Sequence, residues 1–161
     1  MAVSTSTMTS LSRTVSPTCF SQRTIVPSVT VKSWFGIRIG IPLGGDDLTH
    51  VGYLVFVKDG PTVYLTGDTG YEEVLAIAAE PHKPDVLVTV INGTFRNLGP
   101  AEAAILARKL GVKMVIACHY DLFPANCLPP ELLRTNLKLQ GMGGMYRLLA
   151  HGKPFDYVKT A

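Results

Sequence analysis

The chain has 161 residues, 47% of them hydrophobic, and a formal net charge of +3 at pH 7. This length and composition are sufficient for one domain with its own core. The positive excess lies in residues 1–45, which contain four basic residues and no acidic one, so a basic face that follows nucleic acid is not expected.

The three cysteines, Cys19, Cys118 and Cys127, form no Cys-x-x-Cys pair. An odd number without such a pair argues against a disulfide framework and against a structural zinc site. We therefore expect a reducing, cytoplasmic setting. No apolar run reaches the ~18–20 residues that a membrane-spanning helix requires, so no membrane partner is expected.

Residues 1–30 are rich in Ser and Thr, carry Arg and lack acidic residues. This composition is typical of a disordered tail. It is also found in organelle transit peptides and would arise from a truncated or shifted reading frame. We assign 1–30 to a disordered tail and 31–161 to the folded part.

Hydrophobic periodicity and breaker residues predict alternating strands and helices. The expected elements are a strand at 31–43, a loop at 44–50, a β-hairpin at 51–68, a helix at 71–80, a strand at 85–91, a helix at 100–111, a strand at 112–119, a helix at 128–139, and a strand and turn at 145–158. Residues 85–119 form the βαβ unit of a partly parallel sheet, so the fold class is α/β.

Two residues that follow apolar strands, Asp68 and His119, are candidate ligands of one metal ion. Functional side chains gather at the carboxyl ends of parallel strands, where Asn92 also lies. A carboxylate and a neutral imidazole suit Zn²⁺, Mn²⁺ or Fe. The alternatives are that Asp68 serves as a turn or N-cap residue and that His119 is a core histidine bonded to a carbonyl.

The other histidines and Cys118 are weaker candidates. His50 lies in an acidic loop, while His82 and His151 are expected in surface connections. Cys118 alternates to the opposite face of the strand from His119 and is expected to pack. No Gly-rich phosphate loop or GxSxG nucleophile elbow is present.

The loop "INGTFRNLG" offers polar side chains after a buried strand. Such side chains could line a substrate pocket, and Arg96 could bind a phosphate or carboxylate. A solvated loop is the alternative.

The segments "GYLVFVKDGPTVYLTGDTGY", "DVLVTVINGTFRNLGPAEAAILARKLGVKMVIACHYDLFPANCLPPE" and "HGKPFDY" together resemble the C-terminal half of metallo-β-lactamase-superfamily hydrolases. The subgroup that they most resemble is the L-ascorbate-6-phosphate lactonase type. The resemblance implies the C-terminal β/α half of an αββα sandwich, with a mixed sheet flanked by helices. It also implies a divalent metal, Zn or Mn, and a small-molecule substrate that is a sugar phosphate or lactone.

The resemblance assigns roles to six residues. Asp68 in "TGDTG" and His119 in "CHYD" match metal-binding residues of the family. The flanking segments would border the pocket, and their candidate substrate contacts are Asn92, Arg96, Tyr120 and Asn126. No catalytic residue is assigned within this chain.

One family feature is absent from this sequence. The family's His-x-His-x-Asp-His motif does not occur in residues 1–50, and Gly44-Gly45-Asp46-Asp47 stands where many relatives carry a histidine. Typical catalytic zinc sites use three protein ligands and a water. We therefore expect a truncated enzyme, an open apolar sheet face and a possible homo-oligomer. The alternatives are a noncatalytic fragment or pseudoenzyme that acts as a binding or oligomerisation module, and a related hydrolase of phosphodiesters or amides.

Overall fold

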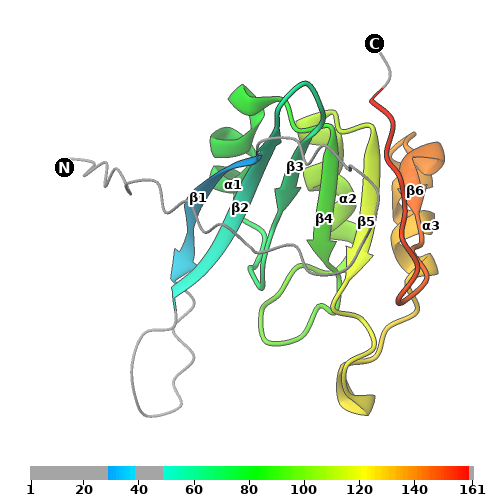
Figure 1. Ribbon diagram of the computed structural model, residues 1–161. Helices are drawn as coiled ribbons and strands as arrows, with labels where there is room; N and C mark the ends of the chain where they lie inside the picture. The colour runs from blue at the N-terminus through cyan, green and yellow to red at the C-terminus, as the bar shows by residue number, and fades with distance from the viewer. Residues whose placement is uncertain (1–28, 39–48, 160–161) are drawn as a thin grey trace, which may run out of the picture.

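A computed structural model of the chain describes residues 29–38 and 49–159 (Figure 1). The predicted tail lies outside the described residues, except for Val29 and Thr30, which belong to the first strand. The strand expected to begin at residue 31 therefore begins two residues earlier, while the division into a tail and a folded part stays a prediction.

A six-stranded mixed sheet runs through the described part of the chain. Its strands lie in chain order: β1 (Val29–Arg38), β2 (Thr49–Val57), β3 (Thr62–Leu65), β4 (Val86–Val90), β5 (Met114–Cys118) and β6 (Tyr146–Arg147). The pairs β1–β2 and β2–β3 are antiparallel, whereas β3, β4, β5 and β6 pair in parallel. This arrangement confirms the predicted α/β class with a mixed sheet.

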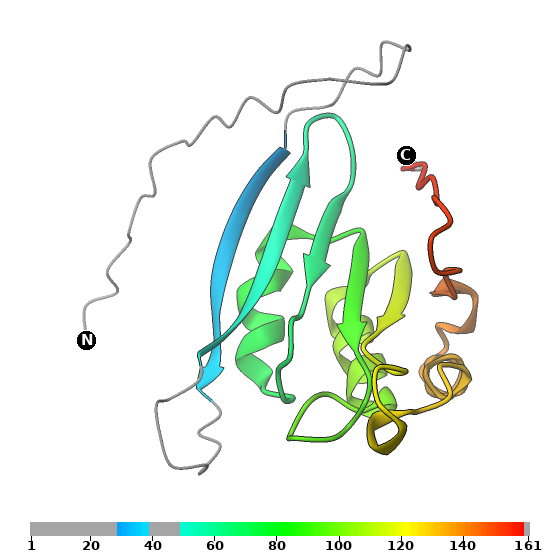
Figure 2. The same ribbon diagram turned by 60° about the horizontal axis from the view of Figure 1, so that its bottom comes forward.

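In the described residues three α-helices accompany the sheet: α1 (Glu73–Ala79), α2 (Pro100–Leu110) and α3 (Glu131–Leu139). Figures 1 and 2 show α1 and α2 against the same face of the sheet, with α3 beside α2 near β6. Single 3₁₀ turns follow at Glu80–His82, Pro124–Asn126 and Gly143–Met145. None of the helices in the described part of the chain is long and apolar enough to cross a membrane.

The ends of α2 follow from its sequence. Pro100 occupies the first helical position, where no backbone N–H is needed, and the Glu102 carboxylate accepts the Gly99 N–H at 2.8 Å. Gly111 ends the helix with φ 63°, a left-handed conformation that glycine adopts without a steric penalty. This predicted helix is confirmed almost to the residue.

Two expected boundaries were wrong by a few residues, and a third is not tested. Thr49 and His50 lie in β2 and not in a loop, because Thr49 pairs with Arg38 of β1 and extends the strand beyond Val51. Helix α3 begins at Glu131 instead of 128, since the preceding Pro129 and Pro130 restrict the backbone. The end of the predicted strand at 31–43 falls outside the described residues.

The core lies between the sheet and the helices. Leu54, Tyr64, Leu87 and Val115 occupy one row across β2 to β5, and each is at most 3% exposed. Burial raises the pKa of the Tyr64 hydroxyl to about 12, so this group remains neutral in the core. Helix α2 packs on this face of the sheet through a stripe of small and apolar side chains.

The opposite face of the sheet is also apolar but is less buried. A neighbouring row consists of Tyr53, Leu65, Val88 and Ile116, of which Tyr53 is 43% exposed and the other three are half-buried. Such a face is expected to favour association with another apolar surface.

Candidate metal site

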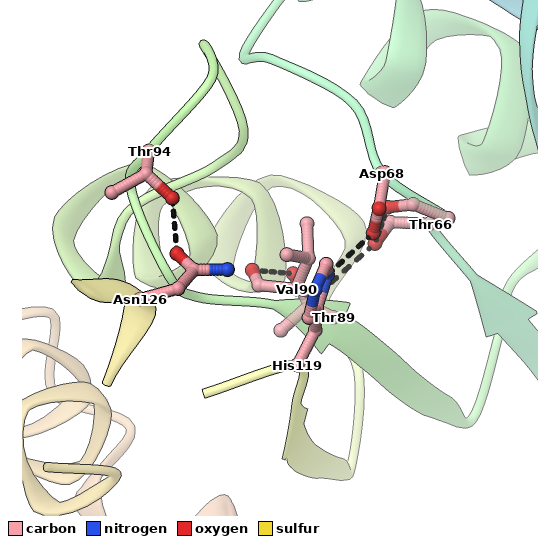
Figure 3. A network of polar contacts seen from close by, with 8 residues as sticks. Thr66, Asp68, Thr89, Val90, Thr94, His119 and Asn126 are labelled. Atoms are coloured by element: carbon pink, nitrogen blue, oxygen red, sulfur yellow. Dashed lines mark hydrogen bonds and ion pairs between the residues drawn. The ribbon is translucent and has the colours of Figure 1, made fainter. Parts of the chain in front are cut away.

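Asp68 and His119 meet at the carboxyl edge of the parallel strands. The two side chains come from loops after β3 and β5, 51 residues apart in sequence, and His119 Nδ1 lies 2.8 Å from Asp68 Oδ1 (Figure 3). Their side chains are 45% and 23% exposed for Asp68 and His119, respectively, so the pair is accessible at the surface. The expectation that these two residues lie together is therefore confirmed.

Buried threonines hold the Asp68 loop against the next strand. The Thr66 N–H donates to the Val88 carbonyl at 3.0 Å, and the Thr66 hydroxyl accepts the Val90 N–H at 3.2 Å. Gly67 then turns the chain with φ 65°. The Thr69 carbonyl accepts the Leu98 N–H at 2.7 Å, so the loop is fixed on both sides of Asp68.

His119 is held in a conformation that few side chains adopt. Its φ is 54°, in the left-handed region, directly after the last residue of β5. Non-glycine residues in this region carry a cost on the order of 1 kcal/mol and cluster at functional sites. The turn directs the imidazole across the edge of the sheet to Asp68, as Figure 3 shows.

The contact determines which nitrogen of His119 carries a proton. An ionised carboxylate only accepts hydrogen bonds, so the His119 Nδ1–H donates to Asp68 Oδ1. In the neutral ring, Nε2 then has a free lone pair. This arrangement can present Nε2 to a metal ion, with Asp68 as the group that orients the ring, or it can open so that both residues bind the ion.

The donor chemistry of this pair fits part of a metal site. Two ligands of one tetrahedral zinc ion stand about 3.4 Å apart, so a shared ion requires the 2.8 Å contact to open slightly. Within 29–38 and 49–159, no group of three or more His, Cys, Asp or Glu side chains is placed to hold a metal ion. The pair therefore fits as two ligands and requires others.

Cys118, the neighbour of His119, forms no group of three potential metal ligands with the pair among the described residues. Burial, assisted by the negative charge of Asp68, raises the pKa of its thiol to about 11. The group is protonated at neutral pH and is half-buried at the end of β5. This agrees with the expectation that it packs.

A second contact joins the loops that follow β4 and β5. The Thr94 hydroxyl donates to Asn126 Oδ1, which links the loop after β4 to the segment after β5 (Figure 3). Asn126 is 6% exposed. Between Thr94 and Asn97, Phe95 and Arg96 have φ 54° and 64°, and both side chains are exposed. Arg96 is therefore exposed in the loop that follows β4.

Asn92 and Tyr120 occupy different surroundings. Asn92 is 4% exposed, and neither its amide nitrogen nor its oxygen has a hydrogen-bond partner among the described residues. Tyr120 is half-buried against the core, and the pKa of its hydroxyl is raised by burial and then by Asp121 and other nearby groups. The assigned substrate roles of both residues stay predictions.

An apolar replacement of Asn92 is expected to stabilise the fold. A buried amide without a partner costs about 1–3 kcal/mol, and leucine has the same branched shape, so Asn92→Leu should raise the free energy of unfolding in urea by about 1 kcal/mol. Asn126→Leu is the matched control, because Asn126 is equally buried but is bonded to Thr94. It should lower stability. Equal losses in both variants would mean that Asn92 is already paired.

The remaining histidines lie elsewhere. The ring of His82 packs edge-on against Phe56, with centroids 5.5 Å apart. His151 Nε2 lies 3.5 Å from an Asp121 carboxylate oxygen in an exposed pair. The side chain of His50 lies outside the described residues. The sequence analysis did not identify the buried threonines at 66, 69 and 89. The only signal in the sequence is that they lie in or just after apolar runs, near the ends of strands.

Comparisons with known proteins place this geometry in context. No model of a protein family matches the chain. It is 33% identical over 131 residues to a UPF0173 metal-dependent hydrolase of Korarchaeum cryptofilum, covering 81% of this chain and 54% of that protein. It is 44% identical over 88 residues to a UPF0173 metal-dependent hydrolase of Myxococcus xanthus, covering 55% of this chain and 31% of that protein. The chain thus spans about half or less of the relatives that it matches.

Solved structures support the same architecture. The metallo-β-lactamase-fold protein YhfI of Bacillus subtilis superposes with a TM-score of 0.56 and 19% identity, over 76% of this chain and 47% of that protein. At this identity the likeness concerns the fold alone. The described residues therefore adopt the mixed α/β architecture of metallo-β-lactamase-fold proteins.

Proposed function

We propose that this chain forms part of a metal-dependent hydrolase of the metallo-β-lactamase superfamily. The observation that carries the proposal is the Asp68–His119 pair, held at 2.8 Å on the carboxyl edge of the parallel strands. The similarity to UPF0173 metal-dependent hydrolases supports it.

Asp68 and His119 would hold a divalent ion, Zn or Mn. When bound, such an ion polarises a carbonyl and activates water for hydrolysis. In the structure the Asp68 carboxylate holds the His119 ring through Nδ1, and this contact would open so that both side chains bind the ion. Because the pair supplies two ligands, the remaining ligands must come from another polypeptide segment or from a second copy of the chain. The apolar outer face of the sheet favours such an association.

The substrate that we propose is a lactone or ester of a sugar phosphate, similar to L-ascorbate 6-phosphate. Arg96 is exposed in the loop that follows β4 and would bind the phosphate through charge-assisted hydrogen bonds. The amide of Asn92, which has no partner among the described residues, would pair with a polar group of the substrate. Asn126 and Tyr120 would complete the lining.

Hydrolysis of matched substrates tests this function. The chain, supplied with Zn²⁺ or Mn²⁺, should hydrolyse a sugar-phosphate lactone with a lower KM than the same lactone without phosphate. Arg96→Gln should raise the KM for the phosphorylated substrate by roughly 10-fold or more and leave that of the other unchanged. Arg134→Gln is the control, because Arg134 is an exposed arginine on α3, away from the site.

Each outcome has a distinct meaning. Equal turnover of both lactones would contradict the phosphorylated substrate and leave the hydrolase. Turnover of a phosphodiester or amide, without turnover of either lactone, would show that the substrate belongs to a different class. No turnover by a chain that holds stoichiometric metal would overturn the catalytic proposal and favour a noncatalytic binding module.

A further inference from the structure

A pocket lies at the edge of the sheet opposite the candidate metal site. It has a volume of about 380 Å³ and is lined by Lys83, Pro84, Asp85, Leu110, Gly111, Lys113 and Lys159. Asp85 and Lys113 directly precede β4 and β5, whereas Asp68 and His119 follow β3 and β5. The parallel strands point downward in Figure 1, so this pocket is at their upper ends and the candidate metal site is at their lower ends.

The lining is strongly positive. It contains three ammonium groups and one carboxylate, a net charge of two positive units. The Lys159 ammonium lies 3.0 Å from the Asp85 carboxylate, and the Lys113 ammonium lies 3.7 Å from it. Both lysine side chains are nearly half exposed, at 45% and 47%, so they also face the pocket and solvent.

Asp85 arranges these lysines. Its carboxylate is buried and accepts the Thr62 N–H at 3.0 Å, and its carbonyl accepts the Lys113 N–H at 2.8 Å. The backbone on which Lys113 sits is thus tied to the residue with which its ammonium pairs. Lys159, from the other end of the chain, is held by the Asp85 carboxylate and by the Gly60 carbonyl at 3.3 Å. Contacts with Asp85 and Gly60 therefore hold the ammonium groups of Lys113 and Lys159 at the pocket.

Lys83 closes the third side of the pocket. It has φ 45°, and its N–H donates to the Glu80 carbonyl at 2.9 Å, which fixes its backbone at the end of the 3₁₀ turn. Pro84 and Leu110 add apolar surface between the charged groups. A half-open pocket of this size, with cationic and apolar walls, suits a small anion with an organic part better than it suits an extended polyanion.

We propose that this pocket binds a phosphate monoester. The two negative charges of such a ligand match the net charge of the lining, and lysine ammonium groups bind phosphate oxygens as point charges. The organic part would lie against Pro84 and Leu110. This site is separate from the candidate metal site and does not depend on the proposed hydrolase activity.

Titration calorimetry at low ionic strength and pH 8 tests the proposal with inorganic phosphate, glycerol 3-phosphate and sulfate as probes. One molecule of glycerol 3-phosphate should bind per chain, more tightly than sulfate. Lys83→Gln and Lys113→Gln should each weaken binding by roughly 5-fold or more, and added salt should weaken it further. Lys138→Gln, an exposed lysine on α3 outside the pocket, should leave binding unchanged.

The outcomes separate this pocket from the metal site. Binding that survives Asp68→Ala and His119→Ala but is lost in the pocket variants supports the proposal. Binding lost in the metal-site variants and kept in Lys83→Gln would overturn it. Equal affinity for all three probes, unchanged in every lysine variant, would mean an adventitious ion only and would also overturn it. Circular dichroism of each variant checks that the fold is retained.

Discussion

Replacing His119 by alanine is expected to weaken the binding of Zn²⁺ or Mn²⁺ by at least about 100-fold, and Asp68→Ala is expected to have a similar effect. The reason is that the described chain offers these two side chains together, 2.8 Å apart, so either change leaves a single donor at the site. Equilibrium dialysis followed by elemental analysis measures both the affinity and the number of ions per chain.

The chain contains a matched control for this experiment. His151 also pairs with a carboxylate, that of Asp121, at 3.5 Å, but its side chain is 78% exposed. His151→Ala should therefore leave metal binding unchanged. If wild type, His119→Ala and Asp68→Ala bind equally, the metal is held elsewhere and the assignment of this site is wrong.

The stoichiometry gives further information about the missing ligands. One ion for two chains, with dimers that form only when metal is present, would indicate that a second copy completes the site. Sedimentation velocity with and without Zn²⁺ distinguishes this from one ion held by a single chain.

Asp85→Asn is expected to lower the free energy of unfolding by about 1–3 kcal/mol at pH 7. Burial alone would raise the pKa of the Asp85 carboxyl, but the Thr62 N–H together with Lys159 and Lys113 outweighs burial and lowers this pKa below its usual value. The ionised carboxylate therefore stabilises the amino ends of β3, β4 and β5. Asparagine keeps the shape but loses the charge, so it weakens these contacts.

The effect of Asp85→Asn should depend on pH in a defined direction. A carboxyl whose pKa is lowered in the folded state contributes its full stabilisation above the unfolded value, near 3.8, and loses it as the pH falls through the folded value. The difference between wild type and Asp85→Asn should thus be constant from pH 5 to pH 7 and shrink below about pH 4. Urea unfolding at pH 7, 5 and 3 measures it. A difference that grows towards low pH would contradict this account.

Local sequence determined most of the secondary structure. Helix α2 could be predicted almost to the residue, because Pro100, Glu102 and Gly111 satisfy its ends through contacts within a few residues. The βαβ unit was equally predictable, since β4 and β5 are short apolar runs around an amphipathic helix. The beginning of β2 was not predictable, because Thr49 joins the sheet only through its pairing with Arg38 of β1.

The site was predictable in outline, because the carboxyl ends of parallel strands share one edge. The positions of Asp68 and His119 just after apolar strands were sufficient to predict that both lie at that edge. Their direct contact, and the proton that it places on His119 Nδ1, depend on the positive φ of His119 and on the Thr66 hydrogen bonds. These are set by packing between segments distant in the chain.

Pairings between distant residues were decided by the tertiary structure alone. Asn92 and Asn126 are the same residue type in similar loops, yet one is buried without a partner and the other is bonded to Thr94. Likewise, Lys159 reaches Asp85 from the other end of the chain and builds a cationic pocket that no local pattern indicates. The sequence by itself therefore determined the elements and the edge at which chemistry is expected, because both follow from short-range periodicity. The folded structure decided which polar groups are paired, because pairing depends on which distant segments the fold brings next to each group.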